Sequence, residues 1–289
     1  ILRRDSLRKE MRMPVLEKGK LKLDYIDEGE GPVIILLHSS ASGNRQWRGF
    51  IESMRSNYRL LAVNLFGYGD TTVWSGAGTQ TFYAQVELIK VLVQQLREPF
   101  SLVGHSFGGA VAMHAALSFG RQIEKLVLFE PIPFHLLRQN GPSDIYHEAI
   151  TLLHHVKCYG SLGDWARVAE TFADYWSGTG TWEHMSEDRK AVFTKNIVPA
   201  LYEVDSLLSE DTTIQQFGKI SAQTLALHAK TTQRPIHALM ALFKQECASW
   251  TVQELNGVGH MAPLTHPDLF ASIVRDFLST DKRRAACFS

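Results

Sequence analysis

The chain has 289 residues, of which 45% are hydrophobic, 21% are charged and 10% are aromatic. Thirty Lys and Arg residues balance thirty Asp and Glu residues, so no net charge attracts nucleic acid or an anionic membrane. This composition excludes a disordered or polyanion-binding protein, and the length suffices for one large domain with or without an insert.

Neither a secretory leader nor a membrane span is expected. The basic residues near the start are not followed by an apolar stretch, and no run of about 18 apolar residues occurs in the chain. Cys158, Cys247 and Cys287 are far apart and odd in number, which favours free thiols over a disulfide framework. We therefore expect a cytoplasmic protein, whose oligomeric state the sequence does not indicate.

Strand-like segments begin near the start of the chain. Leu21, Leu23 and Tyr25 alternate with polar residues after a Lys18-Gly19-Lys20 turn, which predicts an antiparallel hairpin at a sheet edge. Six short apolar runs follow, and the first four lack the alternation of a half-exposed sheet, as is typical of buried parallel strands. The runs are Val33 to His38, Leu60 to Phe66, Phe100 to His105, Lys125 to Glu130, Thr224 to Ala229, and Trp250 to Leu255.

Helical patterns lie between these runs. Apolar residues recur at three- or four-residue spacing from Trp47 to Met54, from Phe82 to Leu96 and from Phe270 to Phe277. Alternating strands and helices predict an α/β fold, with a mostly parallel sheet covered by helices on both faces.

The alternation stops after Glu130 and resumes near Thr224. The intervening residues carry helical patterns and no convincing strand. One helix is expected after Ser161, with Asp164 at capping-box spacing, and another after Ser186, with Pro199 bending or ending it. We expect residues 134–217 to form a helical cap, inserted into a core of residues 14–133 and 218–280.

The segment LVGHSFGGA, from Leu102 to Ala110, joins a predicted strand to a predicted helix. Ser106 stands at the turn, with Gly104 two residues before it and Gly108 two residues after it. A sharp turn at this point needs almost no side chain at those two positions, because the strand passes close to the helix. The free N–H groups of the helix N-terminus favour developing negative charge, so the pattern predicts a nucleophilic serine.

Four motifs in the same order resemble the α/β-hydrolase superfamily. Gly104 to Gly108 resemble its nucleophile elbow. His38-Ser39-Ser40-Ala41 resembles its oxyanion loop, with Ser39 in place of glycine, and Asn64 to Gly69 resemble the loop after the next strand, with Asn64 where Asp is usual. Gly257 to His260 resemble the loop that carries its histidine. The resemblance covers nearly the whole chain and implies a serine hydrolase with a helical cap.

The resemblance also implies roles for particular residues. His260 is expected to act as general base on Ser106, and the backbone N–H groups of Phe107 and Ser40 are expected to form the oxyanion hole. A serine nucleophile argues against dehalogenase and epoxide hydrolase chemistry, which uses aspartate. No metal or organic cofactor is required.

The third member of the triad is missing from its usual place. In the superfamily a carboxylate usually follows the strand that corresponds to Thr224 to Ala229. Here the loop reads Lys230-Thr231-Thr232-Gln233-Arg234, with Thr232 at roughly the expected position, and no Asp or Glu occurs between Asp211 and Glu246. Glu130, at the tip of the neighbouring strand, is the favoured acid, since some members carry it there. The alternatives are a Ser–His dyad or an inactive protein in which Glu130 only ends a strand.

The predicted activity is hydrolysis of a small to medium apolar ester through an acyl-enzyme. No cluster of Arg or Lys in the sequence marks an anionic substrate. Carbon–carbon bond hydrolysis and perhydrolysis remain open alternatives, because the same residues serve them. A catalytically weak ligand-binding sensor on a hydrolase scaffold is a further alternative, kept open by the missing loop acid.

Overall fold

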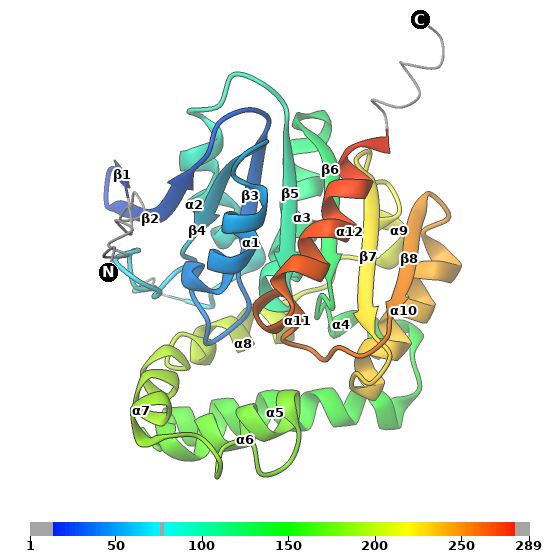
Figure 1. The fold of residues 1–289 in the computed structure, drawn as a ribbon. Helices are drawn as coiled ribbons and strands as arrows, with labels where there is room; N and C mark the ends of the chain where they lie inside the picture. Colours follow the sequence, from blue (N-terminus) through cyan, green and yellow to red (C-terminus); the bar gives the residue numbers. More distant parts are fainter. Residues whose placement is uncertain (1–13, 76–77, 281–289) are drawn as a thin grey trace, which may run out of the picture.

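The computed structural model describes residues 14–75 and 78–280. Within these ranges the centre is an eight-stranded sheet in the order β1-β2-β4-β3-β5-β6-β7-β8 (Figure 1). The β1–β2 hairpin and the β2–β4 pair are antiparallel, and the remaining pairs are parallel. The strands are β1 (Val15–Lys18), β2 (Leu21–Glu28), β3 (Val33–Leu37), β4 (Arg59–Val63), β5 (Phe100–His105), β6 (Ile123–Phe129), β7 (Gln223–Ala229) and β8 (Trp250–Leu255). The predicted mostly parallel sheet and its edge hairpin are confirmed.

Helices cover both faces of the sheet. The one-turn 3-10 helix η1 (Asn44–Trp47) leads into α1 (Arg48–Met54), which packs with α12 (Pro267–Leu278) on one face. On the other face lie α2 (Phe82–Val93), α3 (Phe107–Phe119) and α10 (Arg234–Glu246). Ile34 and Leu36 of β3 belong to one hydrophobic cluster, whereas Ile35 and Leu37 belong to the other. Burial on both faces explains why the apolar runs show no alternation.

Six helices lie between β6 and β7 in the described chain: α4 (His135–Asn140), α5 (Ser143–Ser161), α6 (Trp165–Ser177), α7 (Glu187–Asn196), α8 (Ala200–Ser209) and α9 (Ile214–Phe217). Figure 1 shows α5 to α8 as a layer beyond the C-terminal ends of the parallel strands. Helix α4 packs on both α5 and α10, and α9 packs on α3 and α10, whereas α5 also contacts α10 and thereby joins this layer to the core. We propose that the cap consists of α5 to α8, a narrower unit than the insert expected from the sequence.

One helix start differs from the prediction. Helix α5 continues to Ser161, and Asp164 is the N-cap of α6, where its side chain accepts a hydrogen bond from the Arg167 N–H at 3.3 Å. The capping-box pattern pointed to the correct helix but to the wrong cap, because the preceding residues are themselves helical. Ser186 caps α7 as expected, and Pro199 precedes α8.

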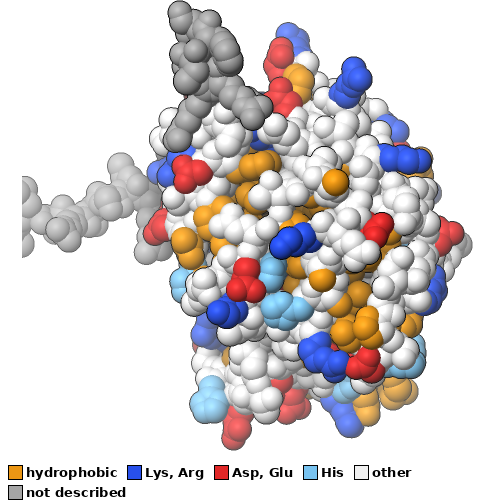
Figure 2. All heavy atoms as spheres, turned by 90° about the vertical axis from the view of Figure 1, so that its right-hand side faces the viewer, with side chains coloured by type: hydrophobic (Ala, Val, Ile, Leu, Met, Phe, Trp, Pro, Cys, Tyr) orange, Lys and Arg blue, Asp and Glu red, His pale blue; other side chains and the backbone are white. Residues whose placement is uncertain are grey.

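The surface beside β8 and α10 carries charges of both signs. In Figure 2 acidic and basic side chains are scattered among small hydrophobic areas, and neither sign forms a continuous patch on this face. Positive and negative charges are thus mixed on this face, in line with the zero net charge of the chain.

Candidate active site

The turn between β5 and α3 holds Ser106 in a strained conformation. Its φ of 55° and ψ of −118° lie where non-glycine residues are rarely found. A Cβ atom at Gly104 would lie 2.5 Å from the Gly108 carbonyl oxygen, and one at Gly108 would lie 2.4 Å from the His38 carbonyl oxygen. Strain of this kind costs on the order of 1–3 kcal/mol and typically persists at functional sites.

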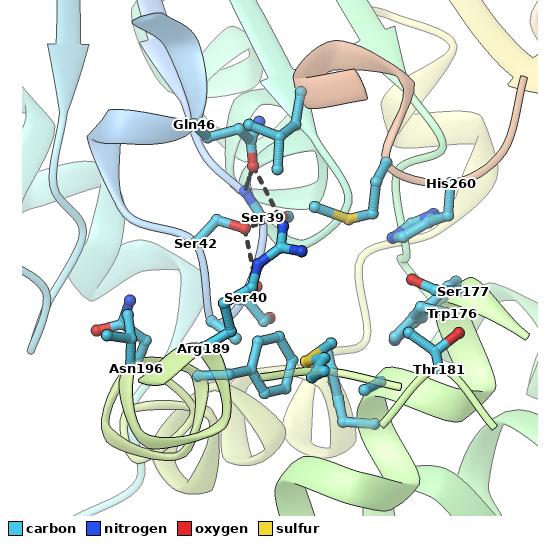
Figure 3. A pocket seen from close by; sticks show the side chains of 18 of the residues that line it. Ser39, Ser40, Ser42, Gln46, Trp176, Ser177, Thr181, Arg189, Asn196 and His260 are labelled. Carbon is cyan, nitrogen blue, oxygen red and sulfur yellow. Dashed lines mark hydrogen bonds between the residues drawn. The ribbon is translucent and has the colours of Figure 1, made fainter. Parts of the chain in front are cut away.

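Ser106 opens into a cavity of about 940 Å³ between the core and the cap. The residue is buried, yet it lines this cavity together with His260. Figure 3 shows the cavity between the loop of residues 39–42, the His260 loop and helices of the proposed cap. The cap side is lined by residues of α6 and α7, among them Phe172, Trp176 and Arg189. Ser106 therefore forms part of the cavity wall.

Glu130 and His260 meet beside this cavity. Glu130 directly follows β6 and is fully buried, and its Oε2 accepts a hydrogen bond from His260 Nδ1 at 2.5 Å. The φ of Glu130 is 44°, a second strained non-glycine position. The structure thus brings Glu130 and His260 together, although the two residues lie 130 positions apart in the chain.

Two further donors fix the Glu130 carboxylate. The Ala229 N–H at the end of β7 donates to Oε1 at 2.8 Å, and the Thr232 hydroxyl donates to Oε2 at 2.8 Å. Thr232 occupies the loop in which the superfamily usually carries its acid. A hydrogen-bond donor at this position therefore supports a carboxylate supplied by the neighbouring strand. The sequence located this loop, but it gave no signal for the contact.

The imidazole of His260 is enclosed by rings from the core and the cap. Trp176 of α6 stacks on it, with ring centroids 3.8 Å apart and planes 20° apart. The buried His105 ring lies 4.8 Å away, and burial lowers the pKa of His105 well below its usual value, so this ring is neutral. No hydrogen bond joins Ser106 to His260 among the described residues, and such catalytic bonds often tighten only when substrate binds.

The loop after β3 presents the other predicted oxyanion donor. Burial lowers the pKa of His38 to about 4, and the neutral ring donates from Nδ1 to the Ser39 carbonyl and accepts from the Leu65 N–H at Nε2. His38 thus holds the backbone of two loops in place. In the described chain, neither the Ser40 N–H nor the Phe107 N–H has a hydrogen-bond partner. Both groups are available to bind an oxyanion.

Potential metal ligands lie elsewhere. In the described ranges, ligand atoms of His228 on β7, His237 on α10 and Glu254 on β8 lie within 4.8 Å of one another. None of the three lines the cavity.

Cys158 and Cys247 are free thiols. None of the described helices combines the length and the hydropathy that crossing a bilayer demands.

Comparison with known sequences finds relatives that are hydrolases. A family described as "Alpha/beta hydrolase family" matches residues 34–273. The chain is 23% identical over 256 residues to the pimeloyl-[acyl-carrier protein] methyl ester esterase of Aeromonas salmonicida, covering 86% of this chain and 96% of the relative. It is 24% identical over 271 residues to the 2-hydroxy-6-oxo-2,4-heptadienoate hydrolase of Pseudomonas putida, covering 91% of this chain and 95% of the relative.

Solved structures show the same fold. An esterase from Exiguobacterium antarcticum superposes with a TM-score of 0.73 at 20% identity, covering 90% of this chain and 96% of that one. A bromoperoxidase from Bacillus anthracis superposes with a TM-score of 0.74 at 17% identity, covering 93% and 99%. At these identities the structures establish the architecture alone.

Proposed function

The chain belongs to the alpha/beta hydrolase family, and from this premise we propose that it cleaves esters through an acyl-enzyme formed on Ser106. The observation that carries the proposal is the 2.5 Å hydrogen bond between Glu130 and His260, in a cavity that Ser106 also lines. With Nδ1 of His260 held by the carboxylate, Nε2 is the nitrogen left to receive the serine proton. The free thiols of Cys158 and Cys247 support a cytoplasmic location as part of the same proposal.

The reaction proceeds in two similar halves. His260 Nε2 takes the proton of Ser106 as Oγ attacks the ester carbonyl, and the Ser40 and Phe107 N–H groups stabilise the tetrahedral oxyanion. The intermediate collapses, and His260 returns the proton to the departing alkoxide. A water molecule then loses a proton to His260 and attacks the acyl-enzyme, which releases the acid and restores Ser106.

The cavity is suited to a medium-sized substrate with one polar end. Phe172, Val192 and Phe193 supply apolar surface from the cap. Arg189 of α7 extends into the cavity (Figure 3), and its guanidinium has no ion-pair partner among the described residues. We therefore extend the small to medium apolar ester expected from the sequence to one whose acyl chain ends in an anionic or strongly polar group.

Carbon–carbon bond hydrolysis is the second candidate activity. The Pseudomonas putida relative is named as the hydrolase of 2-hydroxy-6-oxo-2,4-heptadienoate, which also carries a carboxylate. A cavity with an unpaired arginine suits that class as well as it suits an anionic ester. The sensor alternative is weakened, because a carboxylate does reach His260.

A rapid-mixing assay tests the proposal. With p-nitrophenyl esters of two to eight carbons, we expect a burst of p-nitrophenol equal to the enzyme concentration if deacylation is the slower step. Mass spectrometry of the quenched protein should show one acyl group on the peptide that contains Ser106 and none on the peptide that contains Ser177, another serine of the cavity. A protein that releases no p-nitrophenol from any ester of the series contradicts the proposal.

Substitution of Arg189 by alanine tests the substrate class. Loss of a charged hydrogen bond should lower kcat/KM for mono-p-nitrophenyl adipate by about 10-fold or more, while the neutral p-nitrophenyl hexanoate changes by less than about threefold. The matched control is Arg167→Ala, because Arg167 belongs to the cap but stacks on Tyr159 outside the cavity. Equal losses for both esters in Arg189→Ala contradict an anionic substrate.

A further inference from the structure

Glu203 of cap helix α8 is a buried carboxyl without a cation. Only 2% of the residue is exposed, and no Lys, Arg or His forms an ion pair with it within the described ranges. Burial raises its pKa to about 7, against the opposing effect of two hydrogen bonds. A buried acid of this kind opposes folding, so its presence at a site calls for a functional explanation.

Both oxygens of Glu203 lead to the oxyanion loop. The Ser40 hydroxyl donates to Oε2 at 2.5 Å, and the Tyr68 hydroxyl donates to Oε1 at 2.8 Å. Tyr68 in turn accepts a hydrogen bond from the Ala41 N–H at 3.0 Å. One carboxyl group therefore holds the Ser40 side chain directly and the Ala41 backbone through a tyrosine.

The segment held in this way is strained. Ala41 has a φ of 62°, in the left-handed region where a Cβ atom is unfavourable. The preceding Ser40 N–H is the proposed oxyanion donor and is unpaired in the described chain. A turn of this conformation persists only when its surroundings hold it. Glu203 and Tyr68 provide that restraint.

We propose that Glu203 is a positioning residue, which fixes the Ser40–Ala41 turn through the Ser40 and Tyr68 hydroxyls and so makes the oxyanion hole depend on a docked cap. The inference rests on the proposed function, because an oxyanion hole matters only if Ser106 attacks a carbonyl. Physically, α8 carries the restraint across the core–cap boundary. A cap displaced from the core loses both hydrogen bonds at once.

Three substitutions separate positioning from mere packing. Glu203→Ala leaves both hydroxyls without their acceptor. We expect kcat to fall about 10- to 100-fold, which is less than the fall caused by removing one oxyanion donor entirely. KM should change less than about threefold. Glu203→Gln should keep at least about a third of kcat, because Nε2 can donate to Ser40 Oγ while Oε1 accepts from Tyr68. Tyr68→Phe removes the hydrogen bonds of the hydroxyl to Ala41 and to Glu203 Oε1, leaves the Ser40 hydroxyl bonded to Glu203 Oε2, and should also lower kcat.

The matched control is Ser206→Ala on the same helix. Ser206 is fully buried, and its hydroxyl donates to the Gln80 carbonyl at 3.0 Å, so it too joins α8 to the core. It has no hydrogen bond to the oxyanion loop. Ser206→Ala should lower the unfolding temperature and leave kcat within about twofold, since a neutral hydrogen bond contributes about 1 kcal/mol to stability. An equal fall of kcat in Ser206→Ala and Glu203→Ala overturns the proposal.

Hydrogen–deuterium exchange gives a readout that does not depend on activity. The Ala41 amide should exchange faster in Glu203→Ala and Tyr68→Phe than in the wild type. Its exchange rate should be unchanged in Ser206→Ala. Unchanged exchange in Tyr68→Phe overturns the proposal even if Glu203→Ala does not fold. A wild type that cleaves no ester contradicts the proposed function, whereas an active wild type with an unaffected Tyr68→Phe variant contradicts only this inference.

Discussion

Replacement of Ser106 by alanine is expected to lower the turnover of an activated ester by about 10⁴-fold or more, since the variant can form no acyl-enzyme. The hydroxyl of Ser106 contributes little to the stability of the fold. Ser106 is the N-cap residue of α3, but its side chain makes no capping hydrogen bond. Alanine can adopt the same strained turn as well as serine does. The unfolding temperature should therefore stay close to that of the wild type. Steady-state turnover and the acyl-enzyme mass are the measurements.

A serine of the same helix provides the control for this change. Ser118 of α3 donates to the His114 carbonyl and is remote from the cavity lining. Ser118→Ala should keep wild-type turnover. A Ser106→Ala protein that still shows an acyl adduct after mixing with the ester places the nucleophile on another serine.

Replacement of Glu130 by glutamine is expected to lower kcat by about 10⁴-fold, the loss found when a triad carboxylate becomes an amide. The Ala229 N–H can still donate to the amide oxygen, which leaves the amide NH₂ facing His260. Because the NH₂ group donates to Nδ1, the single proton of the neutral ring lies on Nε2. A protonated Nε2 cannot accept the proton of Ser106. The measurement is single-turnover acylation, with circular dichroism to show that the fold persists.

Glu124→Gln is the matched control for Glu130. Glu124 lies on β6, the strand that Glu130 directly follows, and its side chain is exposed. This variant should acylate at the wild-type rate. Acylation by Glu130→Gln within about threefold of the wild type removes Glu130 from the mechanism and favours a Ser–His dyad.

The sequence determined the architecture through local patterns. Continuous apolar runs predicted strands buried on both faces, and the structure places Ile34 and Ile35 in opposite hydrophobic clusters. The elbow was equally visible, because Gly104 and Gly108 are required by backbone contacts that no side chain can enter. Helix α10 was not among the predicted helices, although the apolar residues Ile236, Leu239 and Phe243 that pack it on the sheet follow a helical spacing.

The sequence limited the candidates for the carboxylate that pairs with His260 but did not decide among them. The absence of any carboxylate between Asp211 and Glu246 excluded the usual position, and Glu130 followed as one of several outcomes. Its approach to His260 depends on the order of the strands, which places β6 beside β7 and β7 beside β8. That order is set by packing across the whole sheet.

By itself, the sequence determined the strands, the turn that lifts Ser106 and the histidine that the final loop carries, because each follows from neighbouring residues. Only the tertiary structure decided which groups meet across the boundary between core and cap. Trp176 stacks on His260, and Glu203 holds Ser40, over separations of 84 and 163 residues respectively. Such contacts depend on where separate helices pack, and no local periodicity or propensity encodes a pairing between distant side chains.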